Sequence, residues 1–227
     1  MRADNPYHEP ENNPARIGCI TASDLLDALK TAKGRKTYVY KKATERITNE
    51  TKQGFISAAM VRGQELEAEA KHELEILSKR QVKDFKPAFI KHELIEGFGA
   101  SPDGCWADEN TLIEIKCPEN PAYHLDTVNE KIIKPEYQTQ MLAQLSVMRS
   151  RGFDRCDFIS YYPALHEDGS HFAVVSFVPS LEEIMELEEK VMVLNDEIDA
   201  AIEIVRTQKK ATVEYLRRTN GKTKESK

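Results

Sequence analysis

The apolar residues of this chain change their spacing near Val82, and that change limits its fold more than any other feature of the sequence. Over residues 58–79 they recur at helical spacing, which predicts a long amphipathic helix. From Val82 to Phe98 the period falls to about two, and the run from Leu112 to Cys117 is typical of a strand. A chain that carries both periods is predicted to adopt a mixed α/β fold.

The rest of the chain adds elements in an order that suggests one domain. Thr21 to Asp24 is typical of a capped helix start. Further helices are expected at 38–47, 137–148 and 181 to about 218, strands at 156–162 and 172–178, and a hairpin turn at 107–110. We therefore expect a single domain over residues 16–218, with a central, mostly antiparallel twisted sheet flanked by helices and a long C-terminal helix. A flexible N-terminal arm is expected at residues 1–15 and a basic flexible tail at 219–227.

The net charge of -6 argues at first against a polyanionic partner. The charges are segregated, however: residues 30–52 and 206–227 each carry eight basic residues against two acids, whereas residues 180–205 carry nine acids against one lysine. Solvated helix faces explain such runs as readily as DNA binding does. The candidate contacts to a DNA backbone lie in the first basic run and are Lys33, Arg35, Lys36, Lys41 and Lys42.

Several classes of protein find little support in the sequence. No stretch approaches the roughly 20 apolar residues that a membrane span needs, and residues 1–16 lack an apolar signal core. We therefore expect a cytoplasmic protein without a membrane partner. The cysteines stand singly, which disfavours a zinc or iron–sulfur cluster and predicts buried free thiols. They are Cys19, Cys105, Cys117 and Cys156.

An acid and a lysine project from one face of the strand predicted at residues 111–117. Alternation places Glu114 and Lys116 together, although an acid-x-Lys tripeptide means little alone because the chain contains six. Only this one lies in a strong strand and follows a Ser-Pro-Asp-Gly turn, with ten residues between Asp103 and Glu114. A hairpin brings Asp103, Glu114 and Lys116 together.

Two carboxylates that converge at a strand end suit a hard cation such as Mg²⁺. A nearby lysine can then orient or deprotonate a metal-bound water, or neutralise charge on a phosphodiester under attack. The alternative is an exposed ion pair between Glu114 and Lys116, with Asp103 serving only its turn. The residues by themselves leave both interpretations open.

Four blocks of sequence resemble the lambda exonuclease and YqaJ-type phage recombination nucleases of the PD-(D/E)xK superfamily. The blocks are Arg16 to Ser23, Arg62 to Glu67, Ala100 to Gly104 running into Glu114 to Pro118, and Tyr137 to Gln140 with Gln144. They follow the order and spacing of that family. The resemblance implies a PD-(D/E)xK nuclease-like core.

The resemblance also implies roles for individual residues. The implied metal ligands are Glu67, Asp103, Glu114 and the backbone carbonyl of Ile115. Glu65 is a rival for the helix ligand, but the Gly-x-x-x-Glu spacing from Gly63 selects Glu67. The implied catalytic set consists of Lys116, Asp103, Glu114 and Gln140, of which Gln140 helps to orient the nucleophile and the scissile phosphate.

Three further residues resemble a pocket for the 5′-terminal phosphate of the digested strand: Arg16, Ser23 and Ser101. A guanidinium makes bidentate contacts to phosphate oxygens. A serine near a helix start adds a hydroxyl where the backbone N–H groups favour anions, although Ser23 also suits a plain N-cap. Gln138 and Gln144 are expected to be solvated or structural.

The function implied by the resemblance is a 5′-to-3′ exonuclease on double-stranded DNA that releases mononucleotides. Its cofactor is Mg²⁺, as two ions, with Mn²⁺ as a substitute. Its partners are 5′-phosphorylated DNA ends, two further copies in a ring-shaped homotrimer, and a phage single-strand annealing protein in a bacterial host. The alternatives are a restriction-type endonuclease and a non-catalytic module that binds DNA ends.

Overall fold

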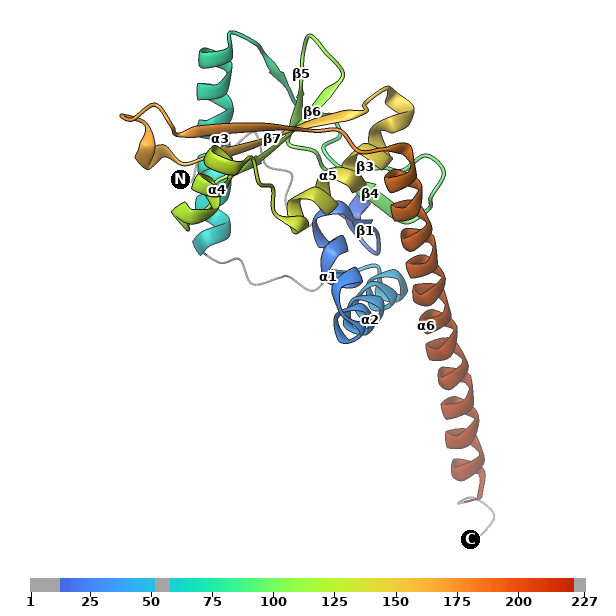
Figure 1. Cartoon of the computed structure of the whole chain (residues 1–227). Coiled ribbons are helices and arrows are strands. Elements are labelled where there is room, and N and C mark those ends of the chain that lie inside the picture. Colours follow the sequence, from blue (N-terminus) through green and yellow to red (C-terminus); the bar gives the residue numbers. More distant parts are fainter. Residues whose placement is uncertain (1–12, 52–57, 223–227) are drawn as a thin grey trace.

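The computed structural model describes residues 13–51 and 58–222 and contains two β-sheets flanked by helices (Figure 1). The smaller sheet has the order β1-β4-β3 and the larger sheet the order β2-β5-β6-β7-β8. The strands are β1 (Ile20–Thr21), β2 (Val82–Lys83), β3 (Ile90–Lys91), β4 (Phe98–Ala100), β5 (Gly104–Trp106), β6 (Thr111–Lys116), β7 (Arg155–Tyr161) and β8 (Phe172–Phe177).

Six α-helices surround the sheets in the described part of the chain. They are α1 (Leu25–Lys30), α2 (Ala32–Thr48), α3 (Ala58–Ser78), α4 (Pro121–Glu130), α5 (Pro135–Met148) and α6 (Leu181–Lys222). Short 3₁₀ turns lie at 14–16, 22–24, 149–151 and 163–165. Helix α6 packs along α2 and α5 and then projects beyond the body of the molecule (Figure 1).

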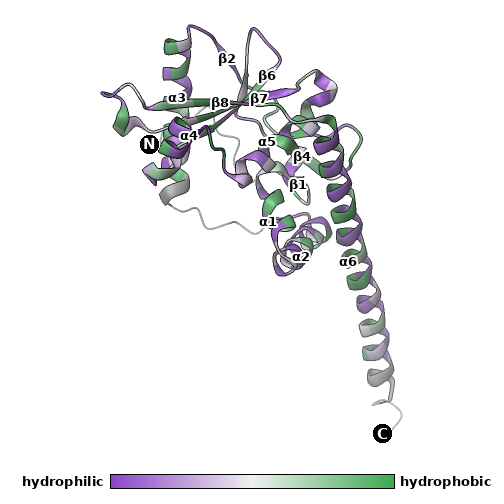
Figure 2. Ribbon diagram, viewed as in Figure 1, coloured by the Kyte–Doolittle hydropathy of each residue, from purple (hydrophilic) through white to green (hydrophobic). Residues whose placement is uncertain are grey.

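The larger sheet separates two hydrophobic clusters, as the alternation in β6 predicts. Leu112 packs into the larger cluster, together with α5 and α6. Ile113 and Ile115 face the smaller cluster, which includes Ala70 and Leu74 of α3. Figure 2 shows the corresponding banding of apolar and polar residues along α3 and α6. The two faces of β6 thus contact different helices, and Glu114 lies on the α5 side.

The mixed α/β fold and the long C-terminal helix are confirmed, with three differences in detail. The predicted meander is divided between two sheets, and the pairs β1–β4 and β6–β7 are parallel. Helix α4 was not predicted, although Asn120 caps it and Pro121 occupies its first position. Helix α2 begins earlier than expected, because the Thr31 hydroxyl accepts a hydrogen bond from Gly34 N. Most of the expected arm and tail lies outside the described residues.

The basic helix α2 and the acidic half of α6 pair with each other. Arg35 lies 2.8 Å from Glu197. Arg46 lies 3.0 Å from Asp199 and also donates to Asn195 and to the Gly18 carbonyl. Much of the charge that suggested a DNA contact is therefore neutralised within the chain.

The structure corrects the expectation for Lys42. Its side chain is buried and pairs with Glu45 at 3.1 Å, so it is not available to a DNA backbone. Lys36 lies over the Tyr40 ring, whereas Lys33 and Lys41 are exposed around a hollow that Asp24 and Asp27 also line. The acids of this hollow oppose a phosphate contact.

Candidate active site

The turn before β5 aims Asp103 at the end of β6. Strands β5 and β6 pair antiparallel, with Gly104 opposite Ile113. Asp103 Oδ2 accepts a hydrogen bond of 2.7 Å from Ile115 N. A Cβ atom at Gly104 would lie 2.8 Å from Val82 Cγ1, so glycine is required for β2 to pair this closely. The hairpin brings Asp103 to Glu114, as the sequence predicted.

Glu114 is fully buried on the face of β6 that α5 covers. Its Oε2 accepts a hydrogen bond of 2.6 Å from Gln144 Nε2, and its Oε1 forms an ion pair with Lys116 Nζ. A buried carboxylate is stable only with such partners. Glu114 therefore has one fixed orientation between a strand lysine and a helix amide.

Lys116 lies at the open end of the same strand face. Its side chain is 26 % exposed, and its ammonium also lies 5.3 Å from the centroid of the Tyr137 ring. The carboxylates of Glu114 and Asp103 raise its pKa despite burial. Lys116 is thus held as a cation at the point where the site meets solvent.

Glu67 approaches the same carboxylates from α3. It is partly exposed and pairs with Lys71 one turn later, at 3.2 Å. Lys71 in turn lies 3.4 Å from Asp84. Burial, and then the charges of Asp103 and Glu114, raise the pKa of Glu67, so Glu67 feels the charge of both strand acids. Helix α3 thus contributes an acid to the end of a sheet that it covers.

Burial and neighbouring carboxylates both raise the pKa of acids in this site. Burial first, and then the charge of Asp103, raises the pKa of both Glu67 and Glu114 from the ordinary 4.5 to about 7. The neighbouring thiol of Cys117 responds to the same field: burial, Glu67 and Asp103 raise its pKa to about 12. The site therefore carries more negative charge than its lysines neutralise.

The donor set fits a hard divalent cation. Asp103, Glu114 and Glu67 supply carboxylate oxygens, and the carbonyl of Ile115 belongs to the same strand end. Oxygen donors are the ligands that Mg²⁺ prefers, and a divalent ion relieves the repulsion that raises these pKa values. The ligand roles of these four residues remain predictions that this geometry suits.

Two of the three residues predicted to bind a 5′-phosphate are in contact. Arg16 Nη1 donates to Ser101 Oγ at 3.0 Å, and the guanidinium lies 5.4 Å from the Phe89 ring centroid. Ser23 is exposed, and its hydroxyl lies 3.5 Å from that of Thr21. Strands β1 and β4 are parallel, so Ser23 and Ser101 both follow strand ends at one edge of the smaller sheet.

The glutamines of α5 have different surroundings, and the structure selects the structural alternative for Gln144. Gln140 is half-buried, and its predicted role stays a prediction. Gln144 is fully buried and donates to Glu114, which excludes the solvated state and gives it a direct contact with the site. Its spacing of four residues from Gln140 placed both on one helix face and was the available signal. Gln138 is exposed and donates to the Ile133 carbonyl.

The fold and the site together define a class of protein. A hairpin that carries an aspartate, a glutamate and a lysine at one end of a mixed sheet, with a helix glutamate beside them, is a PD-(D/E)xK nuclease-like core. The family model described as "YqaJ-like viral recombinase domain" matches residues 12–151. The chain belongs to this YqaJ-like viral recombinase family.

Solved structures extend the similarity beyond the matched region. An alkaline exonuclease, LHK-Exo from Laribacter hongkongensis, is 35 % identical, with a TM-score of 0.77 over 88 % of this chain and 96 % of that one. LHK-Exo in complex with dAMP gives 34 % identity and the same TM-score over 88 % and 97 %.

A phage-related exonuclease from Haemophilus somnus 129PT is 16 % identical, with a TM-score of 0.63 over 82 % of this chain and 96 % of that one, and shares the fold. The comparison with curated proteins finds no match. Within residues 13–51 and 58–222, no helix combines the length and apolar character that a bilayer crossing requires.

Proposed function

We propose that this protein is a Mg²⁺-dependent exonuclease that degrades one strand of linear double-stranded DNA from its 5′ end to mononucleotides. The 3′ single strand that remains is a substrate for annealing in phage-type recombination. One observation carries the proposal: the buried carboxylate of Glu114 is held between Lys116 and Gln144, beside Asp103. The similarity to an alkaline exonuclease, which has also been solved in complex with dAMP, supports it.

In this proposal the acids of the site bind the metal, and the lysine acts on the phosphate. Glu67, Asp103, Glu114 and the Ile115 carbonyl would hold Mg²⁺, as two ions by family resemblance, with Mn²⁺ as a substitute. When bound, Mg²⁺ supplies Lewis-acid activation of water and charge neutralisation at the phosphate. Lys116 pairs with Glu114 in the metal-free chain, and its positive charge would lie near the phosphodiester oxygens.

Recognition of the DNA end is assigned to the edge of the smaller sheet. Arg16 is already oriented by Ser101 and by stacking over Phe89, which reduces the entropy lost on binding a phosphate. Ser23 adds a hydroxyl at the start of the 3₁₀ turn before α1. This pocket would place the 5′ end at a defined distance from the site and so set the direction of digestion.

Assembly and localisation belong to the same proposal. The ring-shaped homotrimer, the annealing partner and the site of action in a bacterial cytoplasm follow from the family resemblance. Beyond its packed half, α6 exposes apolar residues such as Ile204 and Val205, which would suit a contact with another chain. Light scattering after size-exclusion chromatography measures whether the trimer forms.

A comparison of DNA ends tests the function. Linear duplex with a 5′-phosphate is incubated with Mg²⁺ beside the same duplex with a 5′-hydroxyl and beside closed circular DNA. We expect mononucleotides from the phosphorylated duplex and about a tenfold slower reaction on the hydroxyl end, since a charged hydrogen bond contributes about 1.5–3 kcal/mol. Arg16→Ala should remove the preference for phosphate, whereas exposed Lys91→Ala, on the neighbouring β3, should keep it.

Three outcomes would contradict the proposal. Cleavage of closed circular DNA would favour an endonuclease. Equal release of mononucleotides by Asp103→Ala would show that the chemistry lies elsewhere. A lack of any metal-dependent turnover would favour a module that only binds DNA ends.

A further inference from the structure

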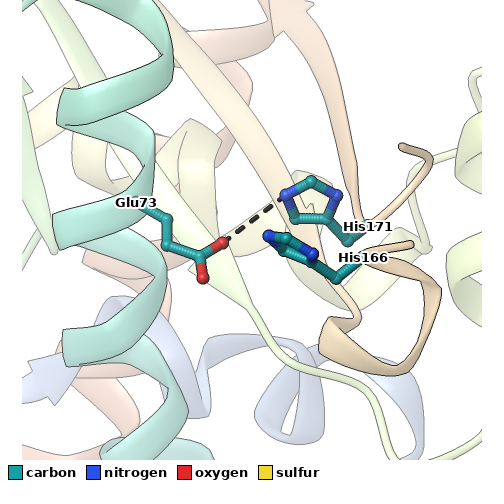
Figure 3. Close-up of side chains that lie close together, drawn as sticks. All are labelled: Glu73, His166 and His171. Atoms are coloured by element: carbon teal, nitrogen blue, oxygen red, sulfur yellow. Dashed lines mark ion pairs between the residues drawn. The ribbon is translucent and has the colours of Figure 1, made fainter. Parts of the chain in front are cut away.

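A second cluster of potential metal-binding side chains includes a residue of α3 other than Glu67. Glu73 comes from α3, His166 from the turn after the 3₁₀ segment at 163–165, and His171 from the residue before β8. Both histidine rings turn a nitrogen toward the Glu73 carboxylate (Figure 3). Their ligand atoms all lie within 4.8 Å of one another.

The distances are close to those of a bound transition ion. Ligands about 2.0–2.1 Å from a tetrahedral ion are separated by roughly 3.3 Å. His171 Nε2 already lies 3.5 Å from Glu73 Oε2. The two histidine rings have centroids 4.6 Å apart at an angle of 42°. Only His166, which is exposed, needs a small movement to complete the set.

The buried atoms of this cluster form no hydrogen bonds, and His171 Nε2 and Glu73 Oε2 only face each other at 3.5 Å. His171 is only 7 % exposed, and among the described residues neither of its ring nitrogens has a hydrogen-bond partner. Glu73 Oε2 is likewise buried and without a hydrogen bond in the described chain. Unsatisfied polar atoms of this kind cost about 1–3 kcal/mol each. A metal ion bound by one ring nitrogen of His171 and by Glu73 Oε2 would give a partner to two of these three atoms.

The cluster is separate from the proposed nuclease site. Glu73 follows Glu67 by six residues, which corresponds to about 9 Å along the helix axis and roughly 120° around it. Glu69, one turn before Glu73, accepts a hydrogen bond of 2.6 Å from the Tyr161 hydroxyl. The two sets of ligands share one helix and no residue.

We propose that Glu73, His166 and His171 form a second divalent-metal site, selective for a borderline ion of the Zn²⁺ type, that ties the β7–β8 turn to α3. Two imidazoles and one carboxylate suit such an ion, whereas Mg²⁺ prefers oxygen ligands alone. Three protein ligands leave one position for water, and the exposed side of His166 gives an entry path. The bound ion links segments that lie far apart in the sequence.

Zn²⁺ binding to the full chain tests this site directly. Chelator-treated protein is titrated with Zn²⁺ by calorimetry in buffer containing Mg²⁺, and thermal unfolding is followed in parallel. We expect one Zn²⁺ per chain and a higher melting temperature. His166→Gln, His171→Asn and Glu73→Gln should each weaken binding about a hundredfold, the scale expected when one of a few ligands is removed. Co²⁺ should give the visible absorption of a tetrahedral site in the unsubstituted chain but not in these three variants.

Two control variants test whether Zn²⁺ binds at this cluster rather than elsewhere on the chain. His72→Ala removes an exposed histidine next to Glu73 and should leave Zn²⁺ binding unchanged. Asp103→Asn alters the carboxylate site and should also leave it unchanged. His166 is exposed, so its substitution does not endanger folding even where that of buried His171 does. Undiminished binding by His166→Gln, or loss of binding in Asp103→Asn, would overturn the proposal.

Discussion

Charge is neutralised in one region of this molecule and left in excess in another. Between α2 and α6, arginines face acids: Arg35 meets Glu197, and Arg46 meets Asp199. At the end of β6, burial first and then the charge of Asp103 raises the pKa of Glu67 and of Glu114. Ion pairs between α2 and α6 hold the two helices together, whereas acids without enough cations beside them are typical of a ligand-binding site. Charged residues thus stabilise helix packing in the first region and form a candidate binding site in the second.

The largest effect on activity is expected from removing Lys116, the cation at the end of β6. Lys116→Ala should lower kcat at least about a thousandfold, equivalent to roughly 4 kcal/mol, because Lys116 is the cation that pairs with Glu114 at the strand end. Single-turnover digestion of 5′-phosphorylated duplex measures it. Lys86→Ala is the matched control, since Lys86 ends another acid-x-Lys tripeptide and is exposed. Comparable losses in both variants would contradict the assignment.

A substitution in α2, where charges are paired, should change the stability of the protein rather than its activity. Lys42→Met leaves the buried Glu45 carboxylate without a positive charge, although it still accepts a hydrogen bond from Gly18 N, and should lower the free energy of unfolding by about 3 kcal/mol. The exposed neighbour Lys41 provides the control. Lys41→Met should change the free energy of unfolding by less than about 0.5 kcal/mol. Urea unfolding followed by circular dichroism gives both values. A small effect at Lys42 would show that the pair contributes little.

An intermediate effect is expected at Gln144, which supports the charged site from α5. Gln144→Leu removes a hydrogen bond to a buried carboxylate, worth about 2 kcal/mol, and should slow digestion about thirtyfold. Mg²⁺ affinity should fall with it, because Glu114 then ionises less readily. Mg²⁺ titrations of activity separate this change from one in kcat. Unchanged Mg²⁺ dependence would limit Gln144 to a packing role.

The smallest effect concerns Mg²⁺ and pH. The raised pKa values mean that these carboxyls stabilise the metal-free fold at acid pH, and that this contribution is lost as pH rises from 4.5 to about 7. Mg²⁺ at ten times its Kd should restore about 1.4 kcal/mol at pH 8 and less at pH 6, where protons compete for the ligands. Thermal unfolding with and without Mg²⁺ measures the difference. Equal stabilisation at both pH values would contradict a carboxylate site.

Local patterns predicted much of the fold and of the site. The helical spacing over residues 58–79 gave α3 almost to the residue, and alternation in β6 placed Glu114 and Lys116 on one face. These features depend on near neighbours, which a sequence displays directly.

Features that depend on distant segments escaped prediction. The division into two sheets follows from pairing Ile20 with Phe98. The burial of Lys42 depends on how α2 packs into the core, and the cluster around His171 on how the β7–β8 turn meets α3. Periodicity carries no information about such contacts.

Helix α3 carries Glu67 at one site and Glu73 at the other, so it acts as a common rigid support for both. Any shift of this helix that one ion favours is imposed on the ligand of the second ion. Thermodynamic linkage then requires reciprocity: the factor by which Zn²⁺ changes the affinity for Mg²⁺ equals the factor by which Mg²⁺ changes the affinity for Zn²⁺. Through this one helix, the Zn²⁺ concentration in the cell would change how tightly the nuclease site binds Mg²⁺.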